Sequence, residues 1–191
     1  MSECDVRHAV ILAGGQSLRM GRNKALIDYL GKPLVRHVAD KLRTVFANVL
    51  VATGDQEVAR AAGCPAIADL VPGHGPLGGI HAALRHCNRP ILCVACDMPY
   101  LNTDFLVDIA MQLGEHDAAI PMHAGYLEPL HAAYSPSCLP TFDLELQRER
   151  TRRFAIVLEG LDVVTIAEEE AARFDPELRT FQNWNTPADI D

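Results

Sequence analysis

The part of the chain with the clearest chemical meaning is a glycine-rich segment that follows the first apolar run. Paired glycines let the backbone turn tightly and approach a ligand with no Cβ in the way, and successive N–H groups of such a loop can bind phosphate oxygens. The segment consists of the run Ala9 to Ala13, the glycines Gly14 and Gly15, and the bases Arg19, Arg22 and Lys24. It matches neither the GxGxxG dinucleotide fingerprint nor the Walker A sequence. The pattern therefore indicates a phosphate-binding loop of another type.

The charges around this loop point to a polyanionic small molecule. No Asp or Glu occurs from Val6 through Ile27, although the whole chain has a net charge of −8. The planar guanidinium of Arg19 suits a clamp on terminal phosphates, and Lys24 supplies a point charge. The alternative is a surface loop whose bases are solvated. The coincidence of a strand end, glycines and bases favours the phosphate site.

A second chemically suggestive position is Asp97, which directly follows the apolar run Ile91 to Cys96. In open parallel sheets, ligands bind outside the carboxyl ends of the strands, so this carboxylate is expected to face the same crevice as Gly14. Mg²⁺ takes carboxylate and phosphate oxygens as ligands. We therefore predict that Asp97 holds Mg²⁺ opposite the phosphate loop. The alternative is an aspartate that shapes the turn before Pro99.

Small residues also open a later helix, in the segment Gly75 to Ile80. Gly78 and Gly79 leave backbone N–H groups free and allow a flat base to lie close to the backbone. Asp69, just upstream at another strand end, is placed to meet a ribose hydroxyl or the metal, or else is an exposed loop acid.

These segments need a scaffold that brings them together. Apolar runs of strand length alternate with segments of helical period, which is typical of an α/β fold with a mainly parallel sheet. The predicted strands are residues 9–13, 48–53, 66–68, 91–96, 118–122, 131–134 and 163–166. A first helix is predicted to start at Pro33, with Leu34, Val38, Leu42 and Val45 on its apolar face, and a last one is predicted to start at Thr186 and Pro187. The other predicted helices are residues 56–62, 77–87, 103–113, 139–149 and 152–159. No internal repeat or linker is visible, so residues 1–191 are predicted to form one domain.

Composition excludes several classes of protein. With 191 residues, of which 49% are apolar and 22% charged, the chain resembles a globular protein rather than a disordered or collagen-like one. No apolar run approaches the roughly 18–20 residues of a membrane span. Acids near the N-terminus argue against a secretory signal, and the acidic balance argues against general affinity for nucleic acid. We therefore expect a cytoplasmic protein with no membrane or nucleic-acid partner.

The cysteines are scattered and need no disulfide framework in such a chain. They are Cys4, Cys64, Cys87, Cys93, Cys96 and Cys138. Cys93 and Cys96 have the spacing of half a zinc site, but no second pair of this kind exists, and both lie in an apolar run. Core packing is therefore predicted for them, with a metal or redox role as the alternative.

Six pieces of the chain, in order between residues 8 and 189, carry a family resemblance. They are Leu12-Ala13-Gly14-Gly15 through Arg19-Met20-Gly21 to Lys24, Gly31-Lys32-Pro33-Leu34, Gly75-Pro76-Leu77-Gly78-Gly79, Cys96-Asp97-Met98-Pro99, Glu128-Pro129-Leu130 and Asn183-Trp184-Asn185-Thr186-Pro187. The first piece alone indicates only a nucleotidylyltransferase for sugar phosphates or similar substrates. With the Glu-Pro-Leu and Asn-x-Asn-Thr-Pro pieces, the chain resembles the molybdenum cofactor guanylyltransferase (MobA) family.

This resemblance implies a reaction, a fold and a set of site residues. The reaction is transfer of GMP from Mg·GTP to the terminal phosphate of Mo-molybdopterin, which gives the guanine dinucleotide cofactor and pyrophosphate. The fold is a three-layer α/β/α sandwich with a mostly parallel sheet, of the GT-A-like nucleotidyltransferase type. By family pattern, Leu12, Ala13 and Gly14 contact the nucleotide, Lys24 the phosphates, Asp69 the GTP, and Asp97 both GTP and Mg²⁺. Transient contact with molybdoenzyme chaperones is also implied.

Two departures from the family pattern bear on nucleotide choice. Some members have an asparagine where this chain has Ala52-Thr53-Gly54, and aspartate is common where this chain has Asn23. Asn-Lys also occurs in the related cytidylyltransferases of the same cofactor, but those enzymes tend to have Ala-Ala-Gly where this chain has Ala13-Gly14-Gly15. We therefore predict GTP rather than CTP. The same scaffold also suits a sugar-phosphate nucleotidylyltransferase, and a nucleotide-binding accessory protein without catalysis is a competing hypothesis.

The acceptor is also anionic and needs contacts of its own. Arg148, Arg150, Arg152 and Arg153 form the densest cationic cluster in the chain. We predict that Arg152 and Arg153 help to bind molybdopterin, while a helix surface with partners such as Glu145 and Glu149 is the alternative. Asn183 and Asn185 are predicted to orient the acceptor or a metal-bound water. His131 and Trp184 are either acceptor contacts or packed residues.

Overall fold

The centre of the protein is a mostly parallel β-sheet. The computed structural model describes residues 6–14, 23–148 and 153–184. Seven strands follow one another across the sheet in the order β10-β7-β9-β6-β1-β4-β5, and β8 pairs with β7 beside them. Of the seven, only β9 runs antiparallel to its neighbours, β6 and β7. The expected mostly parallel sheet is therefore confirmed.

The strands of this sheet occur where apolar runs predict them, except for β8, which the sequence pattern does not predict. They are β1 (His8–Leu12), β4 (Asn48–Ala52), β5 (Ala66–Ile67), β6 (Ile91–Ala95), β7 (Ala118–His123), β8 (Tyr126–Leu127), β9 (His131–Tyr134) and β10 (Val163–Ile166). A separate two-stranded hairpin consists of β2 (Asp28–Tyr29) and β3 (Lys32–Pro33).

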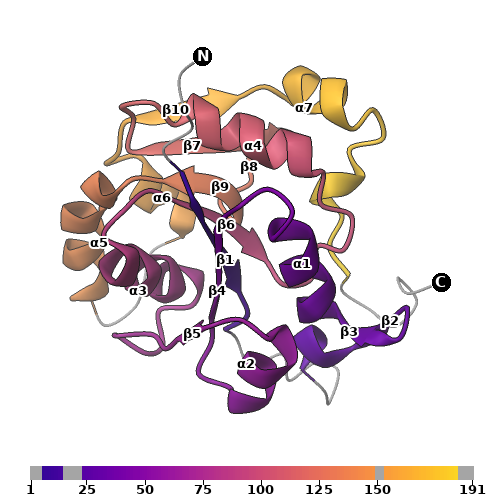
Figure 1. The fold of residues 1–191 in the computed structure, drawn as a ribbon. Helices are drawn as coiled ribbons and strands as arrows, with labels where there is room; N and C mark the ends of the chain where they lie inside the picture. Colours follow the sequence, from indigo (N-terminus) through magenta and orange to yellow (C-terminus); the bar gives the residue numbers. More distant parts are fainter. Residues whose placement is uncertain (1–5, 15–22, 149–152, 185–191) are drawn as a thin grey trace.

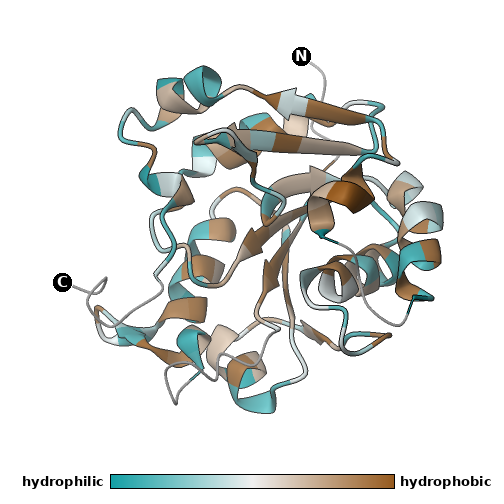
Figure 2. Cartoon of the chain, turned by 180° about the vertical axis from the view of Figure 1, so that it is seen from behind, coloured by the Kyte–Doolittle hydropathy of each residue, from teal (hydrophilic) through white to brown (hydrophobic). Residues whose placement is uncertain are grey.

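Successive residues of the central strands face opposite sides of the sheet. In β1, Ala9 and Ile11 belong to one hydrophobic cluster, whereas Val10 and Leu12 belong to the other. Because side chains alternate along a strand, a run that is apolar at every position must be covered on both faces. Figure 2 shows these central strands as the most hydrophobic part of the ribbon.

Helices cover both faces of the sheet and complete three layers (Figure 1). They are α1 (Leu34–Leu42), α2 (Gln56–Ala62), α3 (Pro76–Cys87), α4 (Thr103–Gln112), α5 (Leu139–Leu146), α6 (Phe154–Leu158) and α7 (Glu168–Phe174). Short 3₁₀ helices are η2 (Lys24–Leu26), η3 (Pro136–Cys138) and η4 (Arg179–Phe181). Buried residues of α1, α2, α4 and α7 share one cluster, and those of α3, α5 and α6 share the other. No helix in the described part of the chain is long and apolar enough to cross a membrane.

Two predictions about α1 are wrong at its ends. The sequence pattern places Pro33 at the first helical position, but Pro33 is the N-cap, because it pairs with Asp28 in the hairpin and has ψ of 139°. The same pattern places Val45 on the apolar face, but the helix ends at Leu42 and Val45 is exposed.

The second half of the chain differs more from the sequence prediction. The helix predicted over 139–149 ends at Leu146, and the one predicted over 152–159 is the shorter α6. The chain also contains β2, β3, β8 and α7, which the sequence pattern does not predict; the three strands have two residues each, too few to show a period. The predicted helix start at Thr186 lies outside the described residues.

Candidate active site

Three parallel strands end side by side and bring Gly14 and Asp97 to the same pocket. In the sheet, Leu12 of β1 is aligned with Ala52 of β4 on one side and with Ala95 of β6 on the other. Beyond the strands, Ala13 N–H donates to the Ala52 carbonyl at 3.0 Å, and Cys96 N–H donates to the Leu12 carbonyl at 3.1 Å. The predicted convergence at the carboxyl ends of these strands is confirmed.

A pocket of about 150 Å³ lies at this edge of the sheet. Its wall is formed by the ends of β1 and β6, the start of η2, the first residue of α3 and the residue before β9. These residues are Leu12, Ala13, Gly14, Asn23, Lys24, Pro76, Ala95, Cys96, Asp97 and Leu130. Five predicted site residues therefore line one pocket: Leu12, Ala13, Gly14, Lys24 and Asp97.

Lys24 and Asp97 form an ion pair across this pocket. Lys24 Nζ lies 3.4 Å from Asp97 Oδ2, and each side chain is 20% exposed, so both can reach a ligand. Lys24 is held by η2, whose N-cap Asn23 accepts a hydrogen bond from Ala25 N–H at 3.1 Å. Asn23 also donates to Asp55 Oδ2 at 3.2 Å, which ties η2 to the start of α2. The residue that departs from the family pattern thus has a structural role here.

The C-terminal segment also contacts Asp97, through the backbone of Trp184. Trp184 N–H donates to the Asp97 carbonyl at 2.9 Å, so the predicted acceptor residue Asn183 is adjacent to the site. Asn183 Oδ1 is buried and has no hydrogen-bond partner among the described residues. Trp184 itself is 2% exposed and packs edge-on against Tyr29, with ring centroids 4.6 Å apart. Trp184 is therefore a packed residue of the core.

The N-terminus of α3 and Asp69 form a second wall beside β1. A Cβ on Gly78 would lie 3.3 Å from Asp69 Oδ2, and a Cβ on Gly79 would lie 3.2 Å from Leu12 Cδ2. Both glycines are therefore needed for the close approach of α3 to its neighbours. Burial raises the pKa of the Asp69 carboxyl above its usual value. Asp69, Gly78 and Gly79 thus lie together beside Leu12, although none of the three lines the pocket that contains Lys24 and Asp97.

Thr53 lies in the segment Ala52-Thr53-Gly54, where this chain departs from the family pattern. It is buried, and its Oγ1 donates to the Ala13 carbonyl at 3.2 Å and accepts a hydrogen bond from Asp55 N–H at 3.1 Å. Thr53 therefore fixes the loop after β4 to the loop after β1. Its single hydroxyl proton is already donated to Ala13, so this side chain could only accept a further hydrogen bond from a bound base.

His131 is a packed residue and not a group that faces the pocket. It is fully buried, with Phe105 at 5.9 Å and Phe181 at 5.2 Å between ring centroids, and its Nε2 lies 3.4 Å from Thr180 Oγ1. Burial lowers the pKa of His131 to about 3, so its imidazole is neutral at physiological pH. Of the two roles considered for this residue, packing is the correct one.

Asp97 is the residue that fits a hard divalent cation. A carboxylate that faces a phosphate-binding loop is the ligand type that Mg²⁺ uses together with substrate phosphates.

The predicted core role of Cys93 is confirmed by its complete burial, and Cys96 packs against the same apolar layer as β1. Burial raises the pKa of the Cys96 thiol to about 12, so this thiol is protonated and a poor metal ligand.

Some predicted residues are not brought to this site or cannot be placed. Gly15, Arg19, Arg152 and Asn185 lie outside the described residues. Arg153 is exposed at the N-cap of α6, on the side of the sheet that α5 and α6 cover. Arg148, just beyond the end of α5, is paired at 2.9 Å with the buried carboxylate of Glu145 rather than with an acid on the helix surface.

Three contributors to the site were missed by the sequence analysis. Asn23 caps η2, Thr53 links two strand ends, and the backbone of Trp184 holds Asp97. An Asn directly before a short helical turn is a recognisable cap signal. The other two contacts join residues distant in sequence and have no local signal.

Comparison with known proteins gives the same picture as the geometry. Residues 9–162 match the MobA-like NTP transferase domain. The chain is 37% identical to a probable molybdenum cofactor guanylyltransferase from Pelotomaculum thermopropionicum, over 95% of this chain and 88% of that protein. It is 33% identical to one from Peptoclostridium acidaminophilum, over 95% and 86% of the two chains.

A solved structure agrees over nearly the whole chain. It is molybdopterin-guanine dinucleotide biosynthesis protein A from Archaeoglobus fulgidus, with a TM-score of 0.82 and 32% identity over 96% of this chain and 94% of that one. The sequence match, the shared fold and the pocket built from the family motifs lead to one conclusion: the chain belongs to the MobA-like NTP transferase family and is a nucleotidyltransferase.

Proposed function

We propose that the protein transfers GMP from GTP to the terminal phosphate of Mo-molybdopterin, with pyrophosphate as the second product. The observation that carries this proposal is the Lys24–Asp97 pair, which lines the pocket beside Gly14 at the carboxyl ends of β1 and β6. The names of the relatives support the choice of acceptor and nucleotide.

The reaction needs charge compensation more than it needs a protein nucleophile. A phosphate of the acceptor attacks the α-phosphorus of GTP, the bond to the β-phosphate breaks, and pyrophosphate leaves with the electron pair. Lys24 donates hydrogen bonds to phosphate oxygens, and its positive charge offsets the negative charge that builds up at the transferred group. We propose that Arg19 acts on the leaving pyrophosphate in the same way.

Asp97 is proposed to hold a divalent metal ion, which we assign as Mg²⁺. When bound, this ion supplies Lewis-acid stabilisation of the phosphate oxygens. The role of the chain is to hold the Asp97 carboxylate in place, and it does so from two sides. The Asp97 side chain is paired with Lys24, and its carbonyl accepts a hydrogen bond from Trp184 N–H.

The nucleoside of GTP is proposed to lie between the loop after β1 and the start of α3. Gly14 and Gly15 let the backbone approach the nucleotide, while Gly78 and Gly79 keep the α3 surface flat. Asp69 is the proposed polar contact to the nucleoside. Its half-buried carboxylate has lost part of its hydration, and a hydrogen-bond donor of the ligand would replace the lost water contacts.

The acceptor is proposed to enter from the side of the C-terminal segment. Asn183 has a buried amide oxygen without a described partner, which makes it available to orient the acceptor, and Asn185 is assigned the same task. Arg152 and Arg153 are proposed to neutralise the anionic end of molybdopterin. We further propose that the protein works in the cytoplasm and passes its product to molybdoenzyme chaperones.

Pyrophosphate release tests the proposal directly. The purified protein is incubated with GTP, CTP, ATP or UTP, with Mg²⁺, and with or without Mo-molybdopterin. We expect acceptor-dependent release from GTP alone. Preference for CTP would assign the protein to the cytidylyltransferases of the same cofactor, which the Asn23-Lys24 pair allows. Absence of release with every nucleotide would contradict the proposal.

A further inference from the structure

A large cavity at the opposite edge of the sheet belongs to no part of the proposed reaction. It has a volume of about 620 Å³ and is lined by the first residue of β1, the start of β4, the loop after α2 and the last turn of α3. His8 lies in this lining and Leu12 in the nucleotide pocket, and four residue steps along a strand span roughly 13 Å. The two cavities are therefore separate sites.

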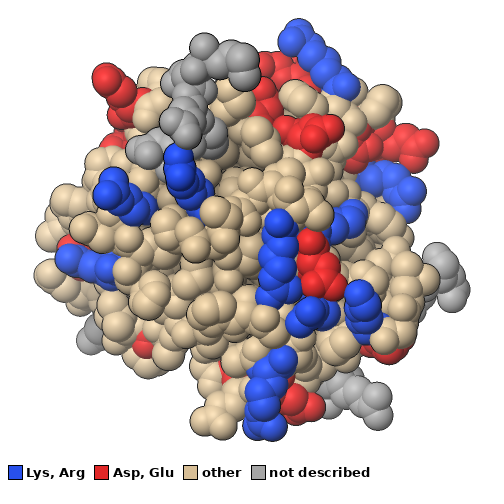
Figure 3. Space-filling model, viewed as in Figure 1, with Lys and Arg blue, Asp and Glu red and all other residues tan. Residues whose placement is uncertain are grey.

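The side chains in this amino-edge cavity that can carry a full charge near neutral pH are all basic. Its described lining contains three basic side chains, His8, Arg43 and His86, and no Asp or Glu. This is unexpected in a chain of net charge −8. The face shown in Figure 3 has a broad area of uncharged side chains over β1 and β4, with basic side chains on either side of it.

One polar atom in the lining lacks a partner among the described residues. His8 Nδ1 is buried and makes no hydrogen bond with any of them. An unpaired buried nitrogen lowers stability, and a ligand in the cavity can bond to it only if the imidazole ring rotates to expose this atom. Burial, with Arg89 and His86 nearby, lowers the pKa of His8 below its usual value. A bound negative charge would reverse the effect of these two neighbours.

The rest of the lining is apolar or neutral. Phe46, Val49 and Pro65 form an apolar wall. Cys64 and Cys87 also line the cavity, and burial raises the pKa of both thiols, so they add no negative charge. In the described part of the chain, no group of three or more His, Cys, Asp or Glu side chains is arranged to hold a metal.

Bases near helix C-termini have a simpler role, because they stabilise the helix dipole. Arg43 follows α1 and donates to the Gly63 carbonyl at 2.6 Å as well as pairing with Asp40, so part of its capacity is used. That role does not account for His8, which is on a strand, or for a cavity within the size range of small-molecule sites.

We infer that the amino-edge cavity binds a small organic anion, with its phosphate or carboxylate group toward His8 and His86 and its apolar part against Phe46 and Pro65. Such a site is remote from the Lys24–Asp97 pair and would act on the nucleotide site only through β1 and β4, which connect the two edges. The inference does not depend on the proposed reaction, since it concerns different residues.

Phenyl phosphate is a suitable probe, with benzyl alcohol as its uncharged counterpart. Binding is followed by the NMR signals of the imidazole rings of His8 and His86, in the presence of saturating GTP so that phosphate loops are occupied. In parallel, mass spectrometry measures the rate at which N-ethylmaleimide labels Cys64 and Cys87. We expect saturable shifts of both imidazoles and slower labelling of both cysteines with phenyl phosphate, and neither effect with benzyl alcohol. Equal effects of the two probes, or no effect of phenyl phosphate, would overturn the inference.

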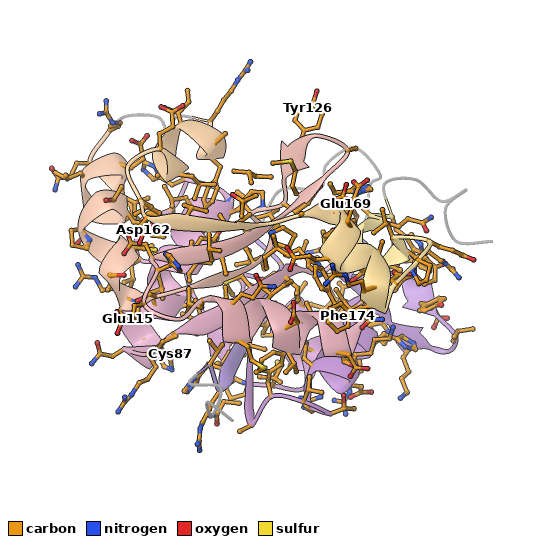
Figure 4. The ribbon with its side chains drawn as sticks, turned by 90° about the horizontal axis from the view of Figure 1, so that it is seen from above. Cys87, Glu115, Tyr126, Asp162, Glu169 and Phe174 are labelled. Atoms are coloured by element: carbon orange, nitrogen blue, oxygen red, sulfur yellow. The ribbon has the colours of Figure 1, made fainter. Side chains whose placement is uncertain are left out.

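Substitution of one exposed base supplies the matched test. His86 is exposed at the end of α3, so His86→Glu should leave the fold intact while it weakens phenyl phosphate binding about tenfold or more, as expected when a charged hydrogen-bond partner is replaced by a like charge. His116→Gln, on a partly exposed histidine paired with Asp162, is the control and should change nothing. The position of His86 can be followed in Figure 4 from its neighbour Cys87, which marks the end of α3 on the side of the molecule away from Tyr126. Unchanged affinity in His86→Glu would contradict the assignment of this cavity.

Discussion

The two edges of the central sheet carry two very different cavities. At the carboxyl edge, a pocket of about 150 Å³ contains the oppositely charged pair Lys24 and Asp97 beside Gly14. At the amino edge, a cavity of about 620 Å³ contains bases and neutral groups, with His8 and His86 among them. The larger cavity is not the one whose residues match a chemical reaction.

This difference teaches that charge arrangement identifies the reaction site better than volume does. The ends of parallel strands and the N-terminus of a following helix present backbone N–H groups and free side chains at the carboxyl edge. At the amino edge the strands start and the helices end, and the described lining of the cavity there contains no Asp or Glu. Substitutions at each edge should therefore have distinct consequences, and those expected to be largest concern the smaller pocket.

Asp97→Asn should have the largest effect. The substitution removes the negative charge proposed to hold the metal, so we expect kcat with GTP to fall by about 10³-fold, in the range for loss of a key electrostatic group. Pyrophosphate release measures the loss, and Tm verifies that the fold persists. Glu115→Gln, which neutralises an exposed acid far from the pocket, is the control. Full activity of Asp97→Asn would contradict the assignment of the reaction to the carboxyl-edge pocket, and the two edges could then no longer be told apart by their charged residues.

Lys24→Ala should have the next largest effect. Loss of its charge removes a contact to the phosphates, so we expect kcat/KM for GTP to fall about 100-fold. Lys32→Ala is the matched control, because Lys32 also pairs with an aspartate, Asp40, but on the exposed surface. Equal activity of the two variants would contradict the role of Lys24.

A third expectation concerns His131, which is sealed inside the protein, in contrast to His8 at the amino-edge cavity. The folded pKa of His131, about 3, is below the unfolded value near 6.5, so the unfolded state binds more protons between these pH values. Stability from this group is complete above pH 6.5 and declines as the pH falls toward 3. Between pH 7 and pH 5 we expect a loss of about 2 kcal/mol in the free energy of unfolding.

Urea unfolding of the wild type and of His131→Phe at both pH values measures this loss. The variant keeps an aromatic ring between Phe105 and Phe181 and cannot titrate at this position. Its free energy of unfolding should therefore decrease by about 2 kcal/mol less than that of the wild type over the same range. The same pH dependence in both proteins would show that His131 does not remain neutral in the fold.

The double variant Arg152→Glu and Arg153→Glu tests the proposed acceptor contacts. Charge reversal should raise KM for Mo-molybdopterin about tenfold and leave KM for GTP unchanged, since the two substrates are bound by different residues. Steady-state kinetics with each substrate varied in turn gives both constants. Arg60→Glu, on the exposed side of α2, controls for the reversal of a single surface charge elsewhere in the molecule. Equal effects on both KM values would contradict the assignment.

The smallest effect is expected for Gly78→Ala. Its new Cβ would lie 3.3 Å from both Asp69 Oδ2 and the Val71 carbonyl oxygen, so one of these neighbours must shift. Overpacking of about 1 kcal/mol would raise KM for GTP about fivefold with little change in kcat. Gly54→Ala is the control, because no described atom lies within 4 Å of the position its Cβ would occupy. An unchanged KM would show that the nucleoside does not depend on this wall.

Most of the sheet could be predicted from the sequence, and the reason is local. The run Ile91 to Cys96 is apolar at every position, which is typical of a strand covered on both faces, and it forms β6. The segment 139–159 was harder, because α5 ends at Leu146 and α6 spans only Phe154–Leu158, and neither helix has a side-chain cap that would mark its start in the sequence. The hairpin of β2 and β3 has two residues in each strand, too few for any periodic pattern.

The sequence alone determined the residue types of the site and the strand ends that carry them. Gly14 and Asp97 each follow a buried run, and parallel strands end at one edge, so their proximity could be inferred. Only the tertiary structure decided which residues meet there, because the contacts are long-range. Lys24 and Asp97 are 73 positions apart, and the hydrogen bond from Trp184 to the Asp97 carbonyl joins the last described part of the chain to its centre. No local preference encodes such contacts, which form only when the packed layers bring the segments together.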